Sequence, residues 1–286
     1  MPETLRGVDR DRLERSCSRR RDSIRFGTGA SGLERAEVYL TACRFEPHRH
    51  DTYTIGITTA GVQTFRYRGA RRISLPGQLV VLHPDEIHDG APGTADGFGY
   101  RALYVAPELV HDALAGAALP FVADPVQKPS EPVRRLALLL TELDDPVSDL
   151  RRAEMAATVA DALRRLTGSP DDRAAAVDFE AVELARDYLA AHAREQTSAS
   201  ILERITGTDR FTLARHFRRA FGTSPDRYRT MRRLELARTA IESGLPFAQA
   251  AARSGFADQS HMTRQFKRAY GFTPSRWTSL TAAPSP

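Results

Sequence analysis

Hydrophobic and polar positions follow two different patterns along the 286 residues of the chain. In 23–106, short runs rich in β-branched and aromatic residues are separated by Gly and Pro at intervals of roughly 8 to 12 residues, as in sandwiches and barrels. No helical period runs through this part of the chain. The pattern therefore predicts an antiparallel β domain that closes on itself.

Apolar residues change to helical spacing after Pro107. They recur every three or four positions in 131–143 and again in 150–166, with Arg and Glu between them, which predicts two amphipathic helices. The stretch 168–177 is small, polar and Pro-containing, as linkers are. The stretch 1–22 is rich in charge and poor in apolar residues, so we expect a mobile tail or an arm over the β domain.

Capping and stop signals divide the rest of the chain into helices. Asp209 and Asp258 are natural N-caps, and Gly222 and Gly271 follow the last positions of the helices that those caps begin. We expect helices near 178–194, 198–205, 209–221, 224–243, 246–253 and 258–270, and a last one from Pro274.

The sequence pattern of one basic helix occurs twice in the chain. The stretch "DRFTLARHFRRAFGTSPDRY" (209–228) matches "DQSHMTRQFKRAYGFTPSRW" (258–277) in its cap, apolar anchors, basic positions and stop signals. A short helix and a Gly-containing turn precede each copy, which is the arrangement of a helix-turn-helix unit. The plain alternative is a solvated helix face, and the repetition argues against it.

The net charge of +5 is concentrated in the part of the chain that holds the repeat. From Asp178 onward there are 17 Lys and Arg against 11 Asp and Glu, whereas 1–177 holds 24 against 25. Outward residues of the repeated helix are expected to face base edges or to hold phosphates of double-stranded DNA. The expected base-facing set is Arg210, Phe211, Arg215, Gln259, Ser260, His261, Thr263 and Arg264. The expected phosphate-binding set is Arg218, Arg219, Arg232, Arg233, Lys267 and Arg268.

The helix expected over 224–243 sets the distance between the two units. About 20 helical residues span about 30 Å, close to the roughly 34 Å between successive major-groove faces on one side of a duplex. One chain could therefore read two neighbouring grooves without a partner subunit.

The stretch "AAARSGFADQSHMTRQFKRAYGFTPSRW" (250–277) closely resembles the signature of the AraC/XylS transcriptional regulators, and the resemblance extends over about 100 residues from Asp178. It implies base-facing roles for Phe211, Arg215, Gln259, Ser260 and Arg264. Three positions depart from the family: Glu203 stands where Ala is usual, Ala214 is too short to hydrogen-bond a base, and Trp277 replaces the common Tyr. We expect the first unit to read less sequence than the second.

The β domain resembles the cupin-type sensor often found ahead of this DNA-binding domain. The resemblance is carried by "FEPHRHDTY", "GVQTFRYRG", "LPGQLVVLHPDEIHDG" and "GYRALYVAP". A small barrel of this kind can enclose one small ligand. The expected effector-binding set is His48, His50, Tyr53, Phe65, His83, His88 and Tyr104.

His48, His50 and His88 also suggest a metal site. In metal-binding cupins, however, Glu follows the His-x-His pair within a few residues, and here it does not. His88 also lies four residues after Pro84, one short of the usual spacing. We therefore expect an organic effector, no metal and no cofactor, with strand-end packing as the plain alternative for these histidines.

These expectations describe an α+β multidomain regulator of transcription. Its parts are a tail (1–22), a cupin-like effector-sensing antiparallel β-barrel (23–106), a helical dimerisation segment (107–167), a linker (168–177) and an all-α double helix-turn-helix domain (178–280). We expect a homodimer. The resemblance implies that it activates transcription, which is the commoner outcome in the family, and contact with RNA polymerase is a further expectation. The alternatives are a metal-dependent cupin enzyme and a DNA-binding regulator without an effector.

The location of the protein is expected to be cytoplasmic. No apolar run approaches the roughly 18 residues of a membrane helix, and no apolar stretch follows the N-terminal arginines as in a signal peptide. Cys17 and Cys43 have no partner spacing typical of a disulfide framework or a zinc finger, so we expect two reduced thiols.

Overall fold

Two antiparallel sheets form the N-terminal domain in the computed structural model, which describes residues 22–167 and 177–282. The expected linker, except Val177, and the expected tail, except Asp22, lie outside these residues. The larger sheet has the order β1 (Ser23–Phe26), β2 (Leu33–Leu40), β9 (Phe98–Val105), β4 (Tyr53–Gly61), β7 (Leu79–Leu82) and β10 (Val126–Gln127). The smaller has the order β3 (Phe45–His48), β8 (His88–Pro92), β5 (Gln63–Tyr67) and β6 (Ala70–Ser74).

Alternation along β4 determines which side chains face the barrel interior. Tyr53 and Ile55 are buried in a cluster with the helices that cover the outer face of the larger sheet. Thr54 and Gly56, one position along from each of them, line an inner cavity together with residues of the smaller sheet. A one-residue change of register would exchange the two faces.

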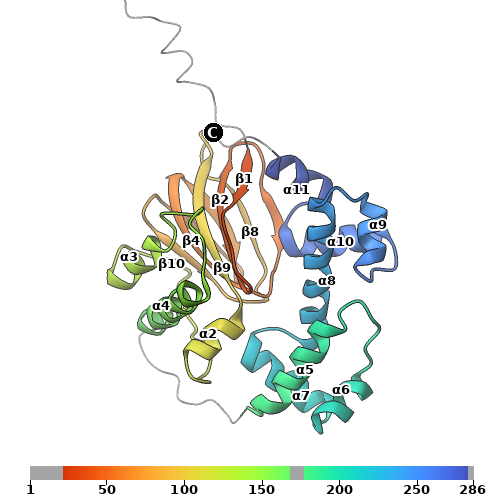
Figure 1. The fold of residues 1–286 in the computed structure, drawn as a ribbon. Coiled ribbons are helices and arrows are strands. Elements are labelled where there is room, and N and C mark those ends of the chain that lie inside the picture. The colour runs from red at the N-terminus through yellow and green to blue at the C-terminus, as the bar shows by residue number, and fades with distance from the viewer. Residues whose placement is uncertain (1–21, 168–176, 283–286) are drawn as a thin grey trace, which may run out of the picture.

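Three helices and a short strand follow the barrel in the segment 107–167. The helices are α2 (Pro107–Ala113), α3 (Glu131–Leu138) and α4 (Asp149–Thr167), and they lie on the outer side of the larger sheet (Figure 1). Leu136, Leu140 and Val159 pack there against the buried residues of β4, β7 and β9. The helices expected over 131–143 and 150–166 correspond to α3, which ends five residues earlier than expected, and to α4. The structure adds α2 and also β10, which pairs with β7.

Seven helices build the C-terminal domain within the described residues. They are α5 (Phe179–Ala191), α6 (Ala199–Thr206), α7 (Arg210–Phe221), α8 (Pro225–Glu242), α9 (Phe247–Arg253), α10 (Gln259–Tyr270) and α11 (Pro274–Thr281). The Asp209 carboxylate accepts hydrogen bonds from two backbone N–H groups of α7, and the Asp258 carboxylate accepts one, from the N–H of His261 in α10. Gly222 and Gly271 end the two helices in the left-handed conformation, with φ of 69° and 75°.

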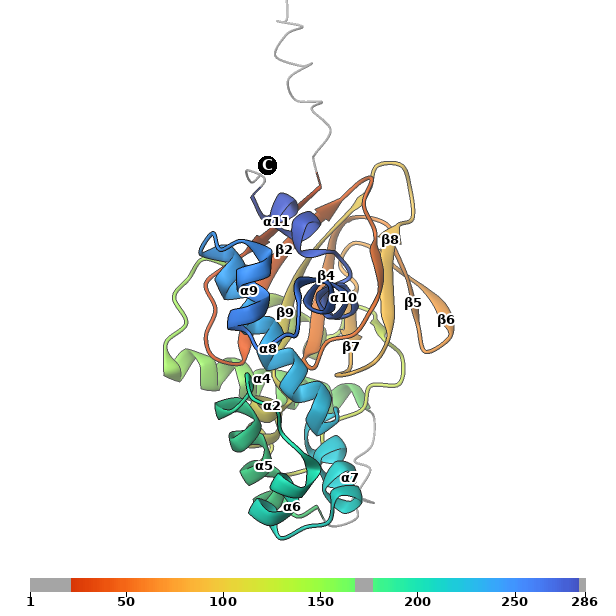
Figure 2. The same ribbon diagram turned by 90° about the vertical axis from the view of Figure 1, so that its right-hand side faces the viewer.

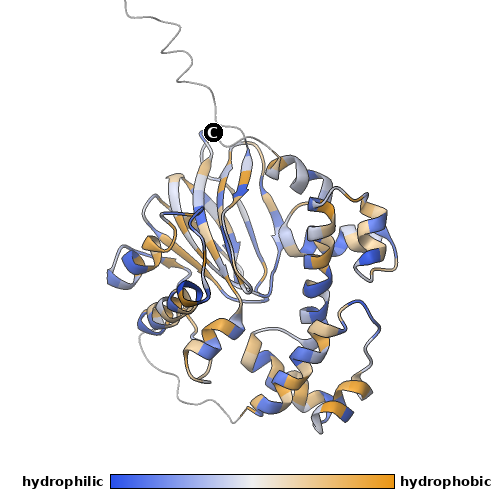
Figure 3. Ribbon diagram, in the orientation of Figure 1, coloured by the Kyte–Doolittle hydropathy of each residue, from blue (hydrophilic) through white to orange (hydrophobic). Residues whose placement is uncertain are grey.

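The two helix-turn-helix units differ in what they pack against. Helices α5, α6 and α7 share a core of their own around Phe217 and Phe221. The second unit shares one continuous core with β1, β2 and β9, in which Phe26 contacts Trp277 and Phe45 contacts Phe272. Figure 2 shows α10 and α11 against the barrel and α5 to α7 below it. Figure 3 shows hydrophobic and hydrophilic residues interleaved along the helices of both domains.

Within residues 22–167 and 177–282, every helix is too short or too polar to cross a lipid bilayer.

Candidate functional site

Helix α7 presents its N-terminal residues to solvent. Phe211 is 72% exposed, which is unusual for a large aromatic side chain, and Arg215 is also exposed. Arg210 is exposed too, but its guanidinium pairs with the Glu203 carboxylate of α6 at 2.8 Å, and its backbone N–H donates to the same carboxylate. Glu203, the departure from the family pattern, therefore ties α6 to the start of α7.

Helix α10 presents a comparable face. Gln259, Ser260 and Arg264 are exposed, while His261 and Thr263 are half-buried. The His261 ring lies edge-on to Phe256, with 5.5 Å between the ring centroids, so part of this side chain packs on the turn before the helix.

Four of the six expected phosphate-binding residues lie on α7 and α10, and they differ in what surrounds them. Arg219 and Arg268 are exposed on α7 and α10. Lys267 pairs with Glu46 of β3 at 2.8 Å, and Arg218 lies 3.9 Å from Asp85 of the barrel. These last two cations therefore face carboxylates of the N-terminal domain.

Arg232 and Arg233 require a correction, because the structure uses both inside the protein. The Arg232 guanidinium bonds the buried Asp51 carboxylate at 2.6 Å, across the interface between the domains. Arg233 donates hydrogen bonds to the backbone carbonyls of Ala193 and Glu195, which follow α5. Their basic character in the sequence reflects domain and helix packing.

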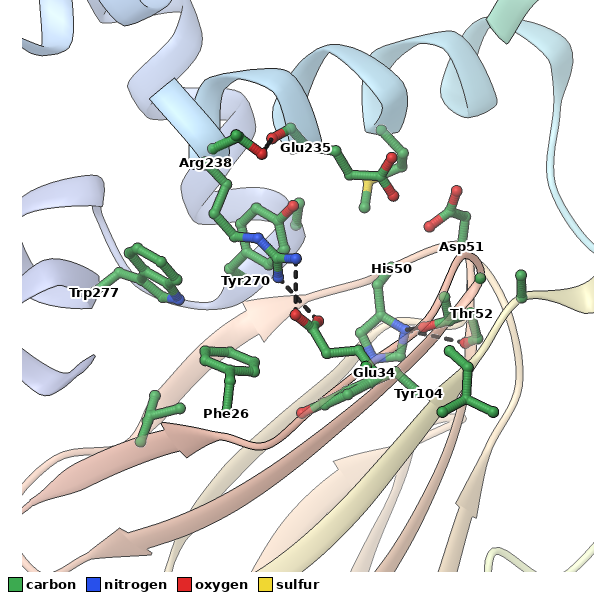
Figure 4. A pocket seen from close by; sticks show the side chains of 18 of the residues that line it. Phe26, Glu34, His50, Asp51, Thr52, Tyr104, Glu235, Arg238, Tyr270 and Trp277 are labelled. Atoms are coloured by element: carbon green, nitrogen blue, oxygen red, sulfur yellow. Dashed lines mark hydrogen bonds and ion pairs between the residues drawn. The ribbon is translucent and has the colours of Figure 1, made fainter. Parts of the chain in front are cut away.

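A cavity of about 520 Å³ lies between the two domains. Its barrel side contains Phe26, Glu34, His50, Asp51 and Tyr104, and its helical side contains Arg232, Glu235, Arg238, Tyr270 and Trp277. Figure 4 shows the labelled members of both sets pointing toward one another, from β1, β2, β9 and the loop after β3 on one side and from α8, α10 and α11 on the other.

Ion pairs cross this cavity. Glu34 of β2 pairs with Arg238 of α8 at 2.8 Å, drawn as dashed lines in Figure 4. Arg232 pairs both with Asp51 and, at 3.0 Å, with Glu235 one turn along α8. Burial raises the pKa of Glu235 to about 7, although Arg232 opposes the change. The cavity thus combines aromatic walls with charges that are already paired.

A second, smaller cavity of about 50 Å³ lies inside the barrel. His48, His50 and His88 border it, and all three side chains are buried. Desolvation lowers the pKa of His50 to about 3 and of His88 to about 4, and it lowers the pKa of His48 well below its usual value. The three rings are therefore uncharged at neutral pH.

The structure places five of the seven expected effector-binding residues on these cavities. His48, His50 and Tyr104 border both, and Phe65 and His88 border the smaller one. Tyr53 and His83 are corrections, because they border neither. The Tyr53 hydroxyl donates to the carbonyl of Pro120 at 3.0 Å. His83 lies between the Tyr67 hydroxyl and the backbone N–H of Val122.

The charged residues Glu34, Asp51, Glu235 and Arg238 line the large cavity but are not among the residues expected from the sequence. Glu34, Asp51 and Arg238 give no local signal, because each looks like an ordinary surface charge in its own segment. Ion pairs between positions about two hundred residues apart become visible only when the domains are docked.

A pair of capped, solvent-facing helix-turn-helix units beside a ligand-sized cavity defines a class of protein, the DNA-binding transcriptional regulators with a ligand-binding domain. A family model described as the AraC-like ligand binding domain matches residues 31–176, and a model described as a helix-turn-helix domain matches residues 202–279. The chain belongs to the AraC family, and it is a transcriptional regulator and not an enzyme.

Similar proteins support the same assignment. YbfI of Bacillus subtilis (strain 168), named as an uncharacterized HTH-type transcriptional regulator, is 26% identical over 230 residues, which cover 77% of this chain and 82% of YbfI. An apo variant of ToxT from Vibrio cholerae has a TM-score of 0.64 at 12% identity, over 89% of this chain and all of that one. Wild-type ToxT with a bound unsaturated fatty acid has a TM-score of 0.61 at 13% identity, over 91% and 95% of the two chains. At these identities the likeness to ToxT shows a shared fold.

Proposed function

We propose that this regulator binds a specific DNA sequence through α7 and α10, and that a small molecule in the cavity between the domains controls this binding. The observation that carries the proposal is the cavity itself, because its walls come from both domains. A ligand there contacts the sensor and the DNA-binding domain at once, so it can change the population of their arrangements.

The proposed assignment of DNA contacts follows from exposure. Arg215, Gln259, Ser260 and Arg264 are free to approach base edges, with Phe211 beside them. Arg219 and Arg268 are placed to hold phosphates. Helix α8 has 18 residues and so measures about 27 Å, which keeps the two units close to one groove repeat apart.

The effector that best fits the large cavity is an amphipathic carboxylic acid. Phe26, Tyr104 and Trp277 offer apolar surface, while Arg232 and Arg238 can each exchange a protein carboxylate for that of a ligand. A ToxT structure contains an unsaturated fatty acid, and another contains (E)-4-(8-methylnaphthalen-1-yl)but-3-enoic acid. Both molecules belong to this chemical class.

The arrangement of the domains in this structure supports control by release. Lys267 pairs with Glu46, and the backbone N–H of Arg49 donates to the carbonyl of Arg268 at 2.9 Å. These contacts occupy the C-terminal half of α10, where phosphates are expected. We propose that DNA binding competes with this docking, and that the effector shifts the balance.

We also propose that the protein forms a homodimer. Leu138 of α3 and Leu150 of α4 are 65% and 72% exposed, which supports pairing of this face with a second copy. Activation of transcription, with contact to RNA polymerase, and a cytoplasmic location complete the proposal.

Selection of DNA tests the first half of the proposal. Purified protein is mixed with random duplexes, and the retained fragments are sequenced. We expect two conserved blocks about one helical turn apart, and weaker retention when Arg264 is replaced by Ala. Retained fragments without any common sequence would contradict sequence-specific binding.

Thermal shifts test the second half. A panel of aliphatic and aryl carboxylic acids should raise the melting temperature of the wild type, since a ligand at 100 times its Kd stabilises by about 2.7 kcal/mol. Arg238→Gln should lose the shift, and Arg253→Gln, an exposed position at the end of α9, should keep it. A response equal in all three proteins would place the ligand elsewhere, and no response would favour a regulator without an effector.

A further inference from the structure

Three histidines meet inside the barrel at one end of the strand pair β3–β8. His48 ends β3, His50 follows it, and His88 begins β8 directly opposite His48. The ring centroids are 4.2 Å apart for His48 and His88, 4.9 Å for His50 and His88, and 6.0 Å for His48 and His50. One ring nitrogen of each lies within 4.8 Å of the other two.

Backbone carbonyls determine which nitrogen of each ring carries the proton. Nδ1 of His48, His50 and His88 lies 2.8, 3.0 and 2.9 Å from the carbonyl oxygen of a residue two positions away. A carbonyl only accepts, so Nδ1–H donates and the lone pair is on Nε2. Among the described residues, the Thr54 hydroxyl near His50 is the one hydrogen-bonding partner of these three Nε2 atoms.

The size of the inner cavity restricts its occupant. At about 50 Å³ it has room for an ion and one water, whose share of liquid volume is about 30 Å³. Pockets for organic ligands measure roughly 300 to 1,000 Å³. An organic effector therefore fits the large cavity and not the inner one, whose volume suits a single ion or a water.

In place of the sequence-based expectation of no metal, we propose that His48, His50 and His88 bind one divalent transition-metal ion, and that this ion stabilises the barrel edge on which the end of α10 rests. Neutral imidazoles suit zinc, iron, nickel and copper. An Nδ1–H that donates to a carbonyl is also the usual outer contact of a metal-bound histidine, because it orients the ring and fixes its tautomer.

Distances allow the site to close. Zn–N bonds are about 2.0 to 2.1 Å long, so two nitrogens on one tetrahedral ion lie about 3.4 Å apart. The three ring nitrogens lie within 4.8 Å of one another, so metal binding would shorten the widest separation between them by at most about 1.4 Å. Rotation of the side chains can supply this change. The three nitrogens leave a fourth position open for a water.

The site touches the second DNA-reading helix. A Cβ placed on Gly271, the residue that ends α10, would lie 3.0 Å from Nδ1 of His48. The backbone N–H of Glu46 donates to the carbonyl of Gly271 at 3.2 Å, and Lys267 pairs with the Glu46 side chain. An ion that holds His48 in place thus also holds β3, the strand that receives α10.

Metal titration tests the site. The full chain is treated with a chelator, and Zn²⁺ is added in competition with a chromophoric chelator, with Co²⁺ as a second, visibly absorbing probe. We expect one ion per chain, and affinity lower by about 100-fold or more in His50→Gln and His88→Gln, since each lacks one of three ligands. His192→Gln, a half-buried histidine on the far domain, should bind as the wild type does. Binding that is not saturable at one ion, or that both variants retain, overturns the proposal.

A second test of the metal site uses the wild type alone, so it does not depend on whether a histidine variant folds. The chain has eight histidines, whose ring signals can be followed by nuclear magnetic resonance of nitrogen-labelled protein. One equivalent of Zn²⁺ should shift the Nε2 signals of three rings and leave those of the other five. Shifts confined to His192, His216 or His261 would place the ion on the surface and overturn the proposal.

The proposed effect of the metal ion on α10 rests on the proposed DNA binding. It is tested separately, by measuring the affinity for DNA with and without Zn²⁺. Because the ion favours the docked arrangement, Zn²⁺ should lower the affinity of the wild type for its selected DNA by about fivefold or more, and that of His88→Gln should not change. Unchanged or raised wild-type affinity overturns the link to α10, while the titration still decides the metal site. If no DNA is selected at all, the proposed function fails and the titration again decides the site alone.

Discussion

Arg264 and Arg268 lie one turn apart on α10, yet exposure and position give them different expected roles. Arg264→Ala should relax specificity at one base pair and cost about 1 to 3 kcal/mol on the selected duplex. Arg268→Ala should weaken binding to all sequences alike and reduce the slope of affinity against salt by about one. Binding curves on selected and scrambled duplexes at several salt concentrations separate the two. Equal and uniform losses would contradict this division of roles.

His83 should make the stability of the barrel dependent on pH. Burial lowers its pKa from 6.5 to about 4, and its Nε2 accepts a hydrogen bond from the N–H of Val122 at 3.0 Å. A protonated ring would turn this acceptor into a second donor. The folded pKa is depressed, so the stabilisation is complete above pH 6.5 and is lost as pH falls toward 4.

The measurement for His83 is a comparison of unfolding curves. The wild type should lose on the order of 3 kcal/mol more than His83→Gln between pH 7 and pH 4, because a pKa difference of one unit corresponds to 1.36 kcal/mol. The comparison cancels the other histidines, which both proteins share. Parallel pH profiles would show that His83 does not titrate in this way.

Side chains whose exposure depends on local pattern could be predicted, and those whose contacts depend on the docking of the domains could not. The exposure of Gln259, Ser260 and Arg264 follows from helical periodicity, which fixes the face that opposes the apolar anchors. Tyr53 was misplaced because strand register decides its face, and register is a tertiary property. Arg232 was misassigned because Asp51, its partner, lies in the other domain.

At the scale of single elements, α6 and α10 end at a comparable pair of glycines. Gly207 and Gly271 both end helices with positive φ, at 66° and 75°. A Cβ on Gly207 meets nothing within 4 Å, whereas one on Gly271 meets His48 and Phe45 of the barrel. Ala at either position costs about 1 kcal/mol for the backbone conformation alone.

We therefore expect Gly271→Ala to destabilise the protein by about 1 kcal/mol more than Gly207→Ala. Thermal unfolding of both variants measures the difference. The backbone cost is common to the two, so the excess reports the contact between α10 and β3. Equal losses would mean that the end of α10 does not rest on the barrel in solution.

Elements with strong local signals were predicted well, the seven-residue α9 included, whereas α2 and β10 were missed. The helices α5 to α11 agree with the expected ranges to within three residues, because most of them combine a capping side chain with an apolar face, and Gly or Pro marks many of their ends. The two-residue β10 is too short to show a period, and α2, unlike the equally short α9, is not part of a repeated unit. Pairing with β7, rather than any preference of its own, makes β10 a strand.

For the whole molecule, the pair between Asp51 and Arg232 should hold the domains together. Asp51→Asn leaves the Arg232 guanidinium in a site that keeps only Glu235, and breaking a buried pair costs on the order of 3 kcal/mol. We expect a larger radius of gyration by small-angle X-ray scattering and a lower melting temperature.

Asp161→Asn is the matched control for that variant. It removes exposed pairs with Arg135 and Arg165 inside the N-terminal domain, which are worth at most about 1 kcal/mol. The radius of gyration of this control should equal that of the wild type. If Asp51→Asn leaves the radius unchanged as well, other contacts are sufficient to keep the domains docked.

The unequal packing of the two DNA-reading units has a consequence for dissecting the protein. A fragment that starts at Asp178 would keep the apolar interior around Phe217 intact, but it would leave Phe272 and Trp277 without the barrel residues that cover them. Such a truncation would yield one well-ordered reader and one that is loosened and prone to aggregate. Suppressor substitutions that restore the fragment are therefore expected in α10 and α11, and not in α6 or α7.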